Sequence, residues 1–405
     1  MRTRYGISPW IDWLPTSRVP DYLRLRGDQA FDVAIVGGGL TGCATAYACA
    51  LAGRKVILVE AERIGRGRSG RSAGLLLPEP GPSFRDVEQA HGLRAARTAF
   101  ESWRRAALEG AALLRRLNIR CALEPVTPLV VAARDDEKML RREFDARSKA
   151  GIEATWLTSK LLSKLTVPEA PAAIRMRDAF TLDPYRACLG LASAAASRGA
   201  VICERSAVKK VKFTRKYVDV IAEGGTIRAS TAIVTTGTAT LQFGQLRRHF
   251  KRREGYLVLT APMPAAIRKQ IGARETTFRD TRNPHRRVRW TSDDRILVTG
   301  ATQDETPERQ RPAVLVQRTG QLMYELLTMF PAISGLMPEY GWELITGETA
   351  DGLMYIGPHR NYPHHLFALG GGGDSVTGAF LAARILARTV QGAAEKDDAV
   401  WGFNR

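Results

Sequence analysis

The segment 31–77 constrains the fold more than any other part of this chain of 405 residues. Two apolar runs flank a stretch of small residues, and the first run leads into Gly37, Gly39 and Gly42 at GxGxxG spacing. The first glycine permits a tight strand-to-helix turn, the second lets the backbone approach a pyrophosphate, and the third lets the helix pack closely on the strand. The pattern therefore predicts a βαβ unit, with strands at 33–36 and 56–59 around a helix at 43–52.

Glu60 ends the second of these predicted strands, 18 residues after Gly42. A carboxylate at this place can accept hydrogen bonds from both ribose hydroxyls, and its charge would repel the 2′-phosphate of NADP. The first turn of the predicted helix offers free N–H groups and a positive dipole end to the phosphates. These features favour a dinucleotide site over a purely structural turn, and the unit alone leaves NAD and FAD open.

The composition is that of a globular protein, with 44% apolar and 25% charged residues. The length suits two closely connected domains. No run approaches the roughly 18 apolar residues of a membrane-spanning helix, and the N-terminal residues lack the apolar core of a secretory signal. The five cysteines have no CxxC spacing, which favours buried free thiols and a cytoplasmic location. The six histidines show no zinc-ligand pairing with them, so no metal site is expected.

The net charge of +19 is the unusual feature of the composition. A strongly basic surface can attract nucleic acid or an anionic membrane. No nucleic-acid motif or stripe of interleaved aromatic residues accompanies the charge. The alternatives are a solvated basic surface and a field that concentrates anionic substrates. The arginine-rich runs lie at 66–71, 104–116, 247–253 and 282–289.

Three later stretches favour FAD over NAD. The sequence GRGRSGRSAG at 65–74 combines small residues with arginines, and we expect Ser69 and Arg71 to direct polar groups at an anion. The run AIVTTG at 232–237 predicts a buried strand that ends close to the cofactor. Four consecutive glycines at 370–373 precede a small-residue helix, which implies close approach of a large flat or anionic group.

With these motifs the chain resembles, over nearly its whole length, the FAD-dependent oxidoreductases of the D-amino acid oxidase (DAO) type, which include glycine and sarcosine oxidases. The stretch SGRSAG is similar to the SGRNGG element of bacterial amine and γ-glutamylputrescine-type oxidases. The motifs that carry the resemblance are VAIVGGGLTG with Glu60, SGRSAG at 69–74, VRWTSDDRILVTG at 288–300, DGLMYIGPH at 351–359 and ALGGGGDSVTGAFLAARIL at 368–386.

The resemblance implies an α/β fold, with a Rossmann-type FAD-binding domain and a discontinuous α+β substrate domain built on an antiparallel sheet. FAD would extend between the domains. It would be non-covalent, because the C-terminal glycine turn lacks the cysteine that tethers flavin in monomeric sarcosine oxidase. The expected FAD-binding domain comprises 1–120, 176–242 and 346–405, with 1–30 as an irregular arm, and the substrate domain comprises 121–175 and 243–345.

The resemblance also implies the cofactor contacts. Val208 would offer backbone groups to the adenine, and a helix N-terminus at 372–377 would stabilise charge at the pyrimidine edge of the flavin. The family more often has Asn-Gly where this chain has Asp374-Ser375, and a carboxylate there would oppose the charge of the reduced ring. The expected contacts are Gly37, Gly39, Leu40, Thr41, Gly42, Glu60, Ala61, Ser69, Gly70, Arg71, Ser72, Val208, Thr236, Gly237, Gly372, Gly373, Asp374, Ser375, Val376 and Thr377.

The implied reaction is oxidation of the C–N bond of an amine or amino acid, by hydride transfer to flavin N5 and hydrolysis of the imine. No acid–base dyad is expected, and the catalytic residues are unassigned. Arg289 and Tyr256 are the candidates for binding a substrate carboxylate, with Trp290 and Trp342 as pocket walls. The enzyme could be an oxidase or a dehydrogenase, so its electron acceptor is oxygen or another molecule. The alternative is a flavin-bound protein that is non-catalytic or RNA-associated.

Overall fold

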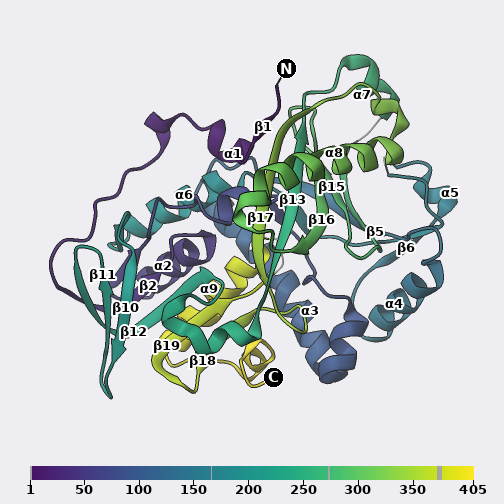
Figure 1. Ribbon diagram of the computed structural model, residues 1–405. Helices are drawn as coiled ribbons and strands as arrows, with labels where there is room; N and C mark the ends of the chain where they lie inside the picture. Colours follow the sequence, from purple (N-terminus) through teal and green to yellow (C-terminus); the bar gives the residue numbers. More distant parts are fainter. Residues whose placement is uncertain (1, 166, 272–273, 372–375) are drawn as a thin grey trace.

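The computed structural model describes residues 2–165, 167–271, 274–371 and 376–405. In this part of the chain, two mixed sheets lie beside each other, with helices packed around them (Figure 1). The first sheet collects segments from the beginning, the middle and the end of the sequence, and the second is built mainly from residues between them. The expected α/β architecture is confirmed.

The first sheet has a parallel core in which strands distant in sequence are neighbours. Its order is β19-β12-β2-β3-β9, and the antiparallel strands β11 and β10 extend from the N-terminal half of β12. The strand β18 pairs with β19. The bounds are β2 Gln29–Val36, β3 Val56–Val59, β9 Val201–Cys203, β10 Val208–Phe213, β11 Val218–Ala222, β12 Gly225–Gly237, β18 Tyr355–His359 and β19 Tyr362–Leu369.

Helices cover one face of this core and the β10–β11–β12 meander covers the other. On β2, Val33 and Ile35 face the helices, whereas Ala34 and Val36 face the meander. This alternation follows from the two-residue period of a strand, and both faces are apolar because the strand is buried on both sides. The covering helices are α2 Leu40–Leu51, α6 Pro184–Ala196 and α9 Thr377–Val390.

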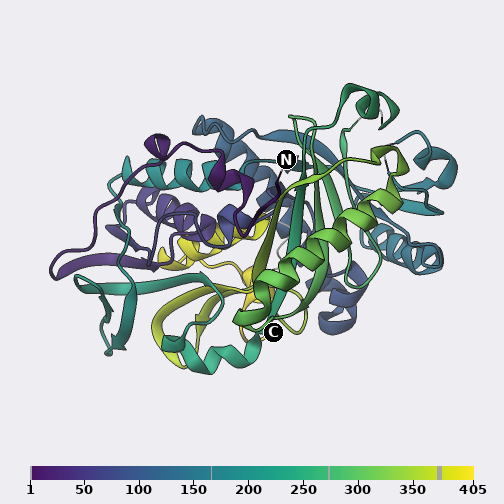
Figure 2. The same cartoon turned by 45° about the horizontal axis from the view of Figure 1, so that its top comes forward.

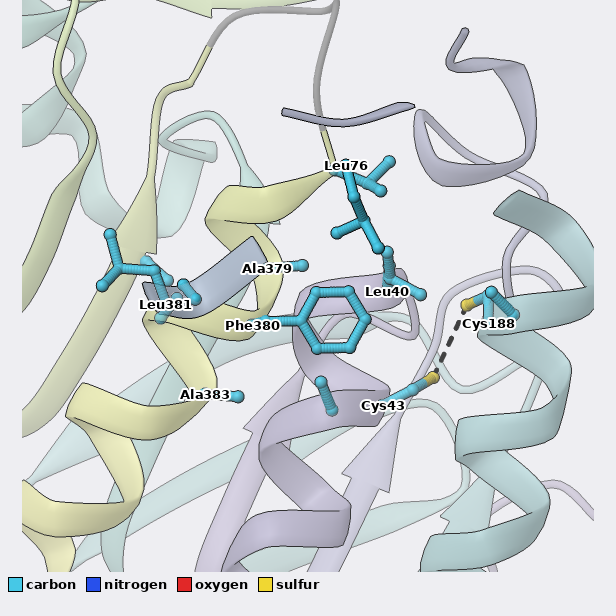
Figure 3. Packing of buried hydrophobic residues seen from close by; sticks show 14 of the residues in the cluster. Leu40, Cys43, Leu76, Cys188, Ala379, Phe380, Leu381 and Ala383 are labelled. Carbon is cyan, nitrogen blue, oxygen red and sulfur yellow. Dashed lines mark hydrogen bonds between the residues drawn. The ribbon is translucent and has the colours of Figure 1, made fainter. Parts of the chain in front are cut away.

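Small side chains on α2 let its neighbours approach closely. Figure 3 shows Phe380 of α9 lying beside α2, and Cys43 and Cys188 facing each other between α2 and α6. The two sulfur atoms are 3.7 Å apart. Cys43 and Cys49 are buried and free, as the sequence predicted, and the other three cysteines are buried and free as well.

The second sheet is mixed, which corrects the expectation of an antiparallel one. Its pairs β14–β5 and β1–β17 are parallel, and no hairpin fixes their direction because each pair joins distant segments. The order is β1-β17-β13-β16-β15-β14-β5-β7-β6, with β8 attached to β5 and β4 attached to β8. The bounds are β1 Arg4–Tyr5, β4 Leu75–Leu76, β5 Glu124–Val131, β6 Thr155–Thr158, β7 Ala172–Arg175, β8 Ala179–Thr181, β13 Lys251–Thr260, β14 Thr276–Asp280, β15 Arg287–Trp290, β16 Ile296–Asp304 and β17 Pro338–Glu348.

Alternation along the second sheet separates two environments. On β13, Tyr256 and Val258 belong to a core beneath α8 (Arg311–Met329), whereas Leu257 and Leu259 join the large core shared with the first sheet. On β15, Val288 and Trp290 likewise lie in the core beneath α8. Figure 2 shows α8 running along the outer side of this sheet. The residues of opposite parity therefore face the first sheet.

The remaining segments connect the two sheets. Asp183 is the N-cap of α6 and accepts hydrogen bonds from the N–H groups of Tyr185 and Arg186, with Pro184 in the first turn, as predicted. The N-terminal arm is held against the rest of the molecule by Trp10, which is buried and donates from Nε1 to the Ser72 carbonyl, 3.0 Å away. The other helices are α1 Pro9–Asp12, α3 Phe84–Arg116, α4 Glu137–Lys149, α5 Ser159–Leu162 and α7 Ala265–Ile271. Among the described helices, none is long and apolar enough to cross a membrane.

Candidate active site

The turn from β2 into α2 requires glycine for steric reasons. A Cβ atom on Gly42 would lie 1.9 Å from the Gly37 carbonyl oxygen, which no side chain can accommodate. Gly37 has φ +109°, a conformation that L-residues rarely adopt, and a Cβ there would meet the Thr235 carbonyl at 3.0 Å. A Cβ on Gly39 would lie 3.0 Å from the Ser69 hydroxyl. The turn is therefore as tight as the strand-to-helix turn of a dinucleotide site requires.

Glu60 lies at the end of β3, beside this turn. Its carboxylate accepts hydrogen bonds from the Gly38 N–H at 2.6 Å and from the Glu62 N–H at 2.9 Å. These bonds fix the carboxylate, and each oxygen retains a lone pair for a ribose hydroxyl. Ala61 is exposed next to it. This geometry fits the adenosine ribose of a dinucleotide.

The N-terminus of α2 faces a narrow groove that includes Leu40, Thr41, Arg68 and Ser69. The Leu40 N–H donates to the Ser69 hydroxyl at 2.8 Å, and the N-cap Gly39 has no side chain to cap the helix. The groove therefore combines a helix N-terminus with a guanidinium, a donor set that suits a phosphate.

Arg68 is the cation of this groove, and the sequence reasoning missed it. Its Nη1 donates to the Gly371 carbonyl at 2.9 Å, and no described carboxylate pairs with it. Burial lowers the pKa of the Arg68 guanidinium, because the charged form loses hydration. A half-buried cation without a described acidic partner suits a bound anion such as a pyrophosphate.

Arg71 was the arginine chosen from the sequence, but its side chain is directed elsewhere. Its Nη1 donates to Glu343 of β17 at 3.0 Å. Gly70 is buried and donates its N–H to the Gly65 carbonyl, while the Ser72 side chain borders the same groove as Arg68. Both arginines lie in the short helical turn after Gly65, so spacing alone could not decide which of them faces the groove.

The other described candidates lie around the ends of β10 and β12. The Val208 carbonyl accepts a hydrogen bond from the Gln242 side chain at 3.0 Å. Thr236 donates its hydroxyl to the Thr238 carbonyl at 2.8 Å. Gly237 has φ +79°, and its carbonyl accepts from the Gly370 N–H at 2.9 Å. Thr236 and Gly237 thus end β12 beside the last glycine-rich turn.

The last turn enters α9, whose N-terminus docks against residues 75–77. The Val376 N–H donates to the Leu75 carbonyl at 2.8 Å, and the Thr377 hydroxyl donates to the Leu77 carbonyl at 2.9 Å. The remaining expected contacts of this turn, Gly372, Gly373, Asp374 and Ser375, lie outside the described residues.

A cavity of about 810 Å³ opens between the second sheet and α3 with the loop before it. Gly371 and Trp103 line both this cavity and the narrow groove, so the two spaces adjoin. The walls are rich in charge. The ionisable side chains among the lining residues are Glu79, Asp86, His91, Arg253, His285, Arg287, Glu348, Asp351, Tyr256, Tyr355 and Arg405.

Glu79 anchors a buried charge network at one wall of the cavity. It pairs with Arg147 at 2.8 Å and with Arg279 at 3.4 Å, and Arg147 also pairs with Glu143 at 2.7 Å. Burial alone would raise the pKa of Glu79, but Arg147, Arg279 and Arg287 outweigh it, and its pKa lies below the usual range. These two acids and three arginines carry a net charge of +1, so this wall favours an anionic group.

His91 and Asp351 form a hydrogen-bonded pair at another wall, and neither residue was among the candidates from the sequence. His91 Nε2 and Asp351 Oδ2 are 2.9 Å apart, and Arg405 donates to both Asp351 oxygens. Burial opposes ionisation of Asp351, but the hydrogen bonds and charge of Arg405 hold its pKa at about 2. Gly92, with φ +82°, kinks α3 directly after His91. Such a kink is not visible in the 3.6-residue period of the sequence.

The substrate candidates from the sequence mostly face away from the cavity. Arg289 donates from Nη1 to the carbonyls of Ala73, at 2.5 Å, and Gly74, at 2.6 Å, and it does not line the cavity. Burial lowers the pKa of Arg289 to about 10. Arg289 therefore supports the loop after the groove. Of these two arginines on the same face of β15, Arg287 is the one that lines the cavity.

The aromatic candidates from the sequence also lie mostly away from the cavity. Trp290 packs against Phe330 beneath α8, with ring centroids 5.7 Å apart. Trp342 is fully buried and donates from Nε1 to the Arg71 carbonyl at 2.8 Å. Tyr256 borders the cavity, but its ring belongs to the core beneath α8 and its hydroxyl contacts Thr306 at 3.3 Å. Of the four candidates, Tyr256 alone borders the cavity among the residues that the structure describes.

Comparison with known proteins identifies the family of the chain. A family described as DAO, FAD dependent oxidoreductase, matches residues 32–389. The chain belongs to this family of FAD-dependent oxidoreductases. The glycine turn, Glu60 beside it and the groove with Arg68 are the parts of the molecule whose polar groups suit the cofactor of such a family.

Individual relatives cover most of the chain at low identity. The gamma-glutamylputrescine oxidoreductase of Escherichia coli K12 is 25% identical over 91% of this chain and 85% of its own length. The glycine oxidase of Bacillus licheniformis is 24% identical over 90% of this chain and 95% of its own length. The crystal structure of glycine oxidase from Geobacillus kaustophilus superposes with a TM-score of 0.77 at 20% identity, covering 93% of this chain and 99% of that one. The last likeness establishes the fold.

Proposed function

We propose that this FAD-dependent oxidoreductase oxidises the C–N bond of a small amine or amino acid. The observation that carries the proposal is the charged cavity of about 810 Å³, which adjoins the cofactor groove at Trp103 and Gly371. The names of the relatives, a glycine oxidase and a gamma-glutamylputrescine oxidoreductase, indicate amines as the substrate class. The five buried free thiols support our proposal of a reducing, cytoplasmic location.

The proposed cofactor contacts follow from the groove. Glu60 would hold the adenosine ribose, and the backbone from Gly37 to Gly42 and Arg68 would hold the pyrophosphate. Val208, Thr236, Gly237, Val376 and Thr377 stay in the proposed set, whereas Arg71 is replaced by Arg68. We also retain non-covalent binding and the division into FAD-binding and substrate domains as proposals. Bound FAD supplies an acceptor for the hydride that leaves the carbon next to nitrogen.

The residues of the cavity would bind and orient the substrate. Arg287 and the Glu79 network place positive charge at one wall, where an anionic group of the substrate can be held. His91 borders the cavity with Nε2 held by Asp351, so its ring orientation is fixed. A neutral amine is the form that loses hydride, and His91 can accept the proton that an ammonium must lose first. Leu77, Leu257 and Leu344 give the cavity apolar walls that limit water.

The test is anaerobic reduction of the bound flavin by a panel of substrates. Glycine, sarcosine, D- and L-amino acids, putrescine and γ-glutamylputrescine would be mixed with the protein, and the visible flavin band followed. We expect at least one amine to bleach the band, and oxygen then to restore it if the enzyme is an oxidase. Glycerol 3-phosphate serves as the alcohol control, because part of the chain matches a glycerol-3-phosphate dehydrogenase subunit of Escherichia coli. Bleaching by glycerol 3-phosphate and by none of the amines would overturn the proposal.

A further inference from the structure

Arg405 binds the carboxylate that holds His91 at the cavity wall. Its guanidinium donates from Nε to Asp351 Oδ2 at 2.6 Å and from Nη2 to Asp351 Oδ1 at 3.0 Å. The same guanidinium donates to the carbonyls of Leu353, at 2.7 Å, and Met354, at 2.8 Å. Only 5% of the Arg405 side chain is exposed. This buried, bidentate contact fixes the plane of the carboxylate as well as its charge.

The segment that carries Arg405 is anchored by aromatic contacts. The Phe403 ring stacks on the Tyr355 ring, with centroids 4.7 Å apart and an angle of 9° between the planes. The Arg405 guanidinium lies 3.9 Å from the centroid of the same tyrosine ring. Trp401 is fully buried, and its ring lies 5.6 Å from that of Trp103, which lines the cavity. Arg405 is therefore held in place as part of the cavity wall.

The Asp351 carboxylate is surrounded by donors. Its Oδ1 also accepts from the Leu353 N–H and from the Thr349 hydroxyl, each at 3.1 Å, and its Oδ2 lies 2.9 Å from His91 Nε2. Burial opposes ionisation, but the hydrogen bonds and charge of Arg405 hold the pKa of Asp351 at about 2. At neutral pH the group is therefore a carboxylate, which can only accept hydrogen bonds. The proton between Asp351 and His91 consequently belongs to His91 Nε2.

This assignment determines what the other nitrogen of the His91 ring can do. A neutral imidazole with its proton on Nε2 carries its lone pair on Nδ1. In the part of the chain that the structure describes, Nδ1 of His91 has no hydrogen-bond partner. His91 lines the cavity, and 17% of its side chain is exposed. Nδ1 is thus the ring nitrogen that can accept a proton from a molecule in the cavity.

We propose that Asp351 and Arg405 are positioning residues, which hold His91 as the Nε2–H tautomer so that Nδ1 accepts a proton from the substrate ammonium. In this step an N–H bond of the ammonium breaks and an Nδ1–H bond forms. The amine keeps the electron pair and becomes neutral, and the positive charge passes to the imidazole beside the Asp351 carboxylate. The inference rests on the proposed amine oxidation, in which the neutral amine is the reactive form.

The tautomer is tested without any substrate, by heteronuclear NMR of the imidazole nitrogens in the FAD-loaded protein. The chain has six histidines, and His91→Gln identifies the signals of His91. At about pH 8, where free imidazole groups are neutral, we expect a proton on Nε2 and none on Nδ1. Asp351→Asn should reverse this assignment. The three donors around Oδ1 retain the amide oxygen there, so the amide NH₂ faces Nε2 and requires a lone pair on it.

Two results of the NMR comparison would overturn the proposal. One is a proton on Nδ1 of His91 in the wild type. The other is the same tautomer of His91 in the wild type and in Asp351→Asn, because the carboxylate would then not determine where the proton lies.

Anaerobic flavin reduction by the best amine of the panel gives a second readout. Asp351→Asn should lower the limiting rate at least about 100-fold, and Arg405→Gln at least about tenfold, because the lone pair of His91 is no longer directed at the amine. The amine concentration that gives half the limiting rate should change less than about twofold, since neither residue is proposed to bind substrate. Arg405→Lys keeps the charge and should recover part of the rate lost in Arg405→Gln.

Arg384→Gln is the matched control for Arg405→Gln. Arg384 joins α9 to α3 by donating to Glu109 at 2.8 Å, and neither residue lines the cavity. This variant should change the limiting rate less than about twofold. Equal losses in the two variants would overturn the proposal, because they would indicate a general response to loosening of α3. A higher half-saturating concentration with an unchanged limiting rate in Arg405→Gln would also overturn it, since Arg405 would then bind substrate.

Failure of the proposed function would look different. In that case no amine would reduce the wild-type flavin, and the NMR comparison alone would decide whether Asp351 and Arg405 position the His91 ring.

Discussion

The cofactor groove and the substrate cavity adjoin each other but are built in different ways. The groove takes its form from a steric requirement within one short segment, where Gly42 meets the Gly37 carbonyl. The cavity is assembled from side chains of distant segments, such as Glu79, Arg287 and Arg405, whose charges are balanced by partners elsewhere. Local backbone geometry therefore determines which cofactor the groove accepts. The placement of charged side chains from distant segments determines which substrate the cavity accepts.

The largest expected effect concerns the charge network of the cavity. Arg147→Met should lower the free energy of unfolding by about 3–5 kcal/mol, because it leaves Glu79 and Glu143 buried without their shared partner. Urea unfolding of the FAD-loaded protein measures this change. The matched control is Arg141→Met on the same helix, whose ion pair with Asp145 is exposed and contributes about 0.5 kcal/mol. Similar losses in both variants would show that the cavity wall does not depend on the buried pair.

A substitution in the glycine turn beside the groove should weaken the binding of FAD. Gly42→Ala places a Cβ where the Gly37 carbonyl lies, so the turn must move away from the pyrophosphate. We expect the Kd for FAD to rise at least about 100-fold, or about 2.7 kcal/mol. Flavin fluorescence titration of the apoprotein gives the value. Gly67→Ala is the control in the neighbouring loop, since a Cβ atom on Gly67 would meet no other atom within 4 Å. An unchanged Kd for FAD in Gly42→Ala would show that cofactor binding does not depend on the geometry of the glycine turn.

Asp351 should give a dependence on pH. Its folded pKa of about 2 lies below the value of about 3.9 for an unfolded chain, so the ionised carboxylate stabilises the fold above about pH 4. This stabilisation, about 2–3 kcal/mol at pH 7, is lost as the pH falls towards 2. The difference in unfolding free energy between wild type and Asp351→Asn should therefore shrink on acidification. A difference that grows at low pH would contradict the assigned direction.

The smallest expected effect separates two arginines of the same loop. Arg68→Gln should raise the Kd for FAD about tenfold, because it removes the groove's cation. Arg71→Gln should change the Kd less than about twofold, because Arg71 faces Glu343. Parallel fluorescence titrations distinguish them. A larger loss for Arg71→Gln would restore the assignment that the sequence suggested.

The sequence predicted the features that depend on local geometry. The glycine turn, the strand ending at Glu60 and the Asp183-Pro184 helix start follow from steric and capping rules that act within a few residues. The parallel pairing of β14 with β5 could not be predicted in this way, since it depends on how distant segments meet.

The same limit explains the errors at the cavity. Arg287 and Arg289 share one face of β15, but only Arg287 lines the cavity. The resemblance pointed to this strand and could not decide which of its two arginines borders the cavity. The sequence did not predict that His91 borders the cavity. The kink of α3 at Gly92, next to the hydrogen-bonded pair of His91 and Asp351, leaves no mark in the 3.6-residue period of the helix.

The central claim is that the groove holds the cofactor while the cavity selects the substrate. The most direct measurement compares wild type and Arg287→Met for two quantities, the FAD bound per chain and the rate of anaerobic flavin reduction by the best amine of the panel. The account predicts unchanged FAD content and reduction slowed at least about tenfold at low substrate concentration. Loss of FAD from Arg287→Met, or unchanged reduction, would contradict it.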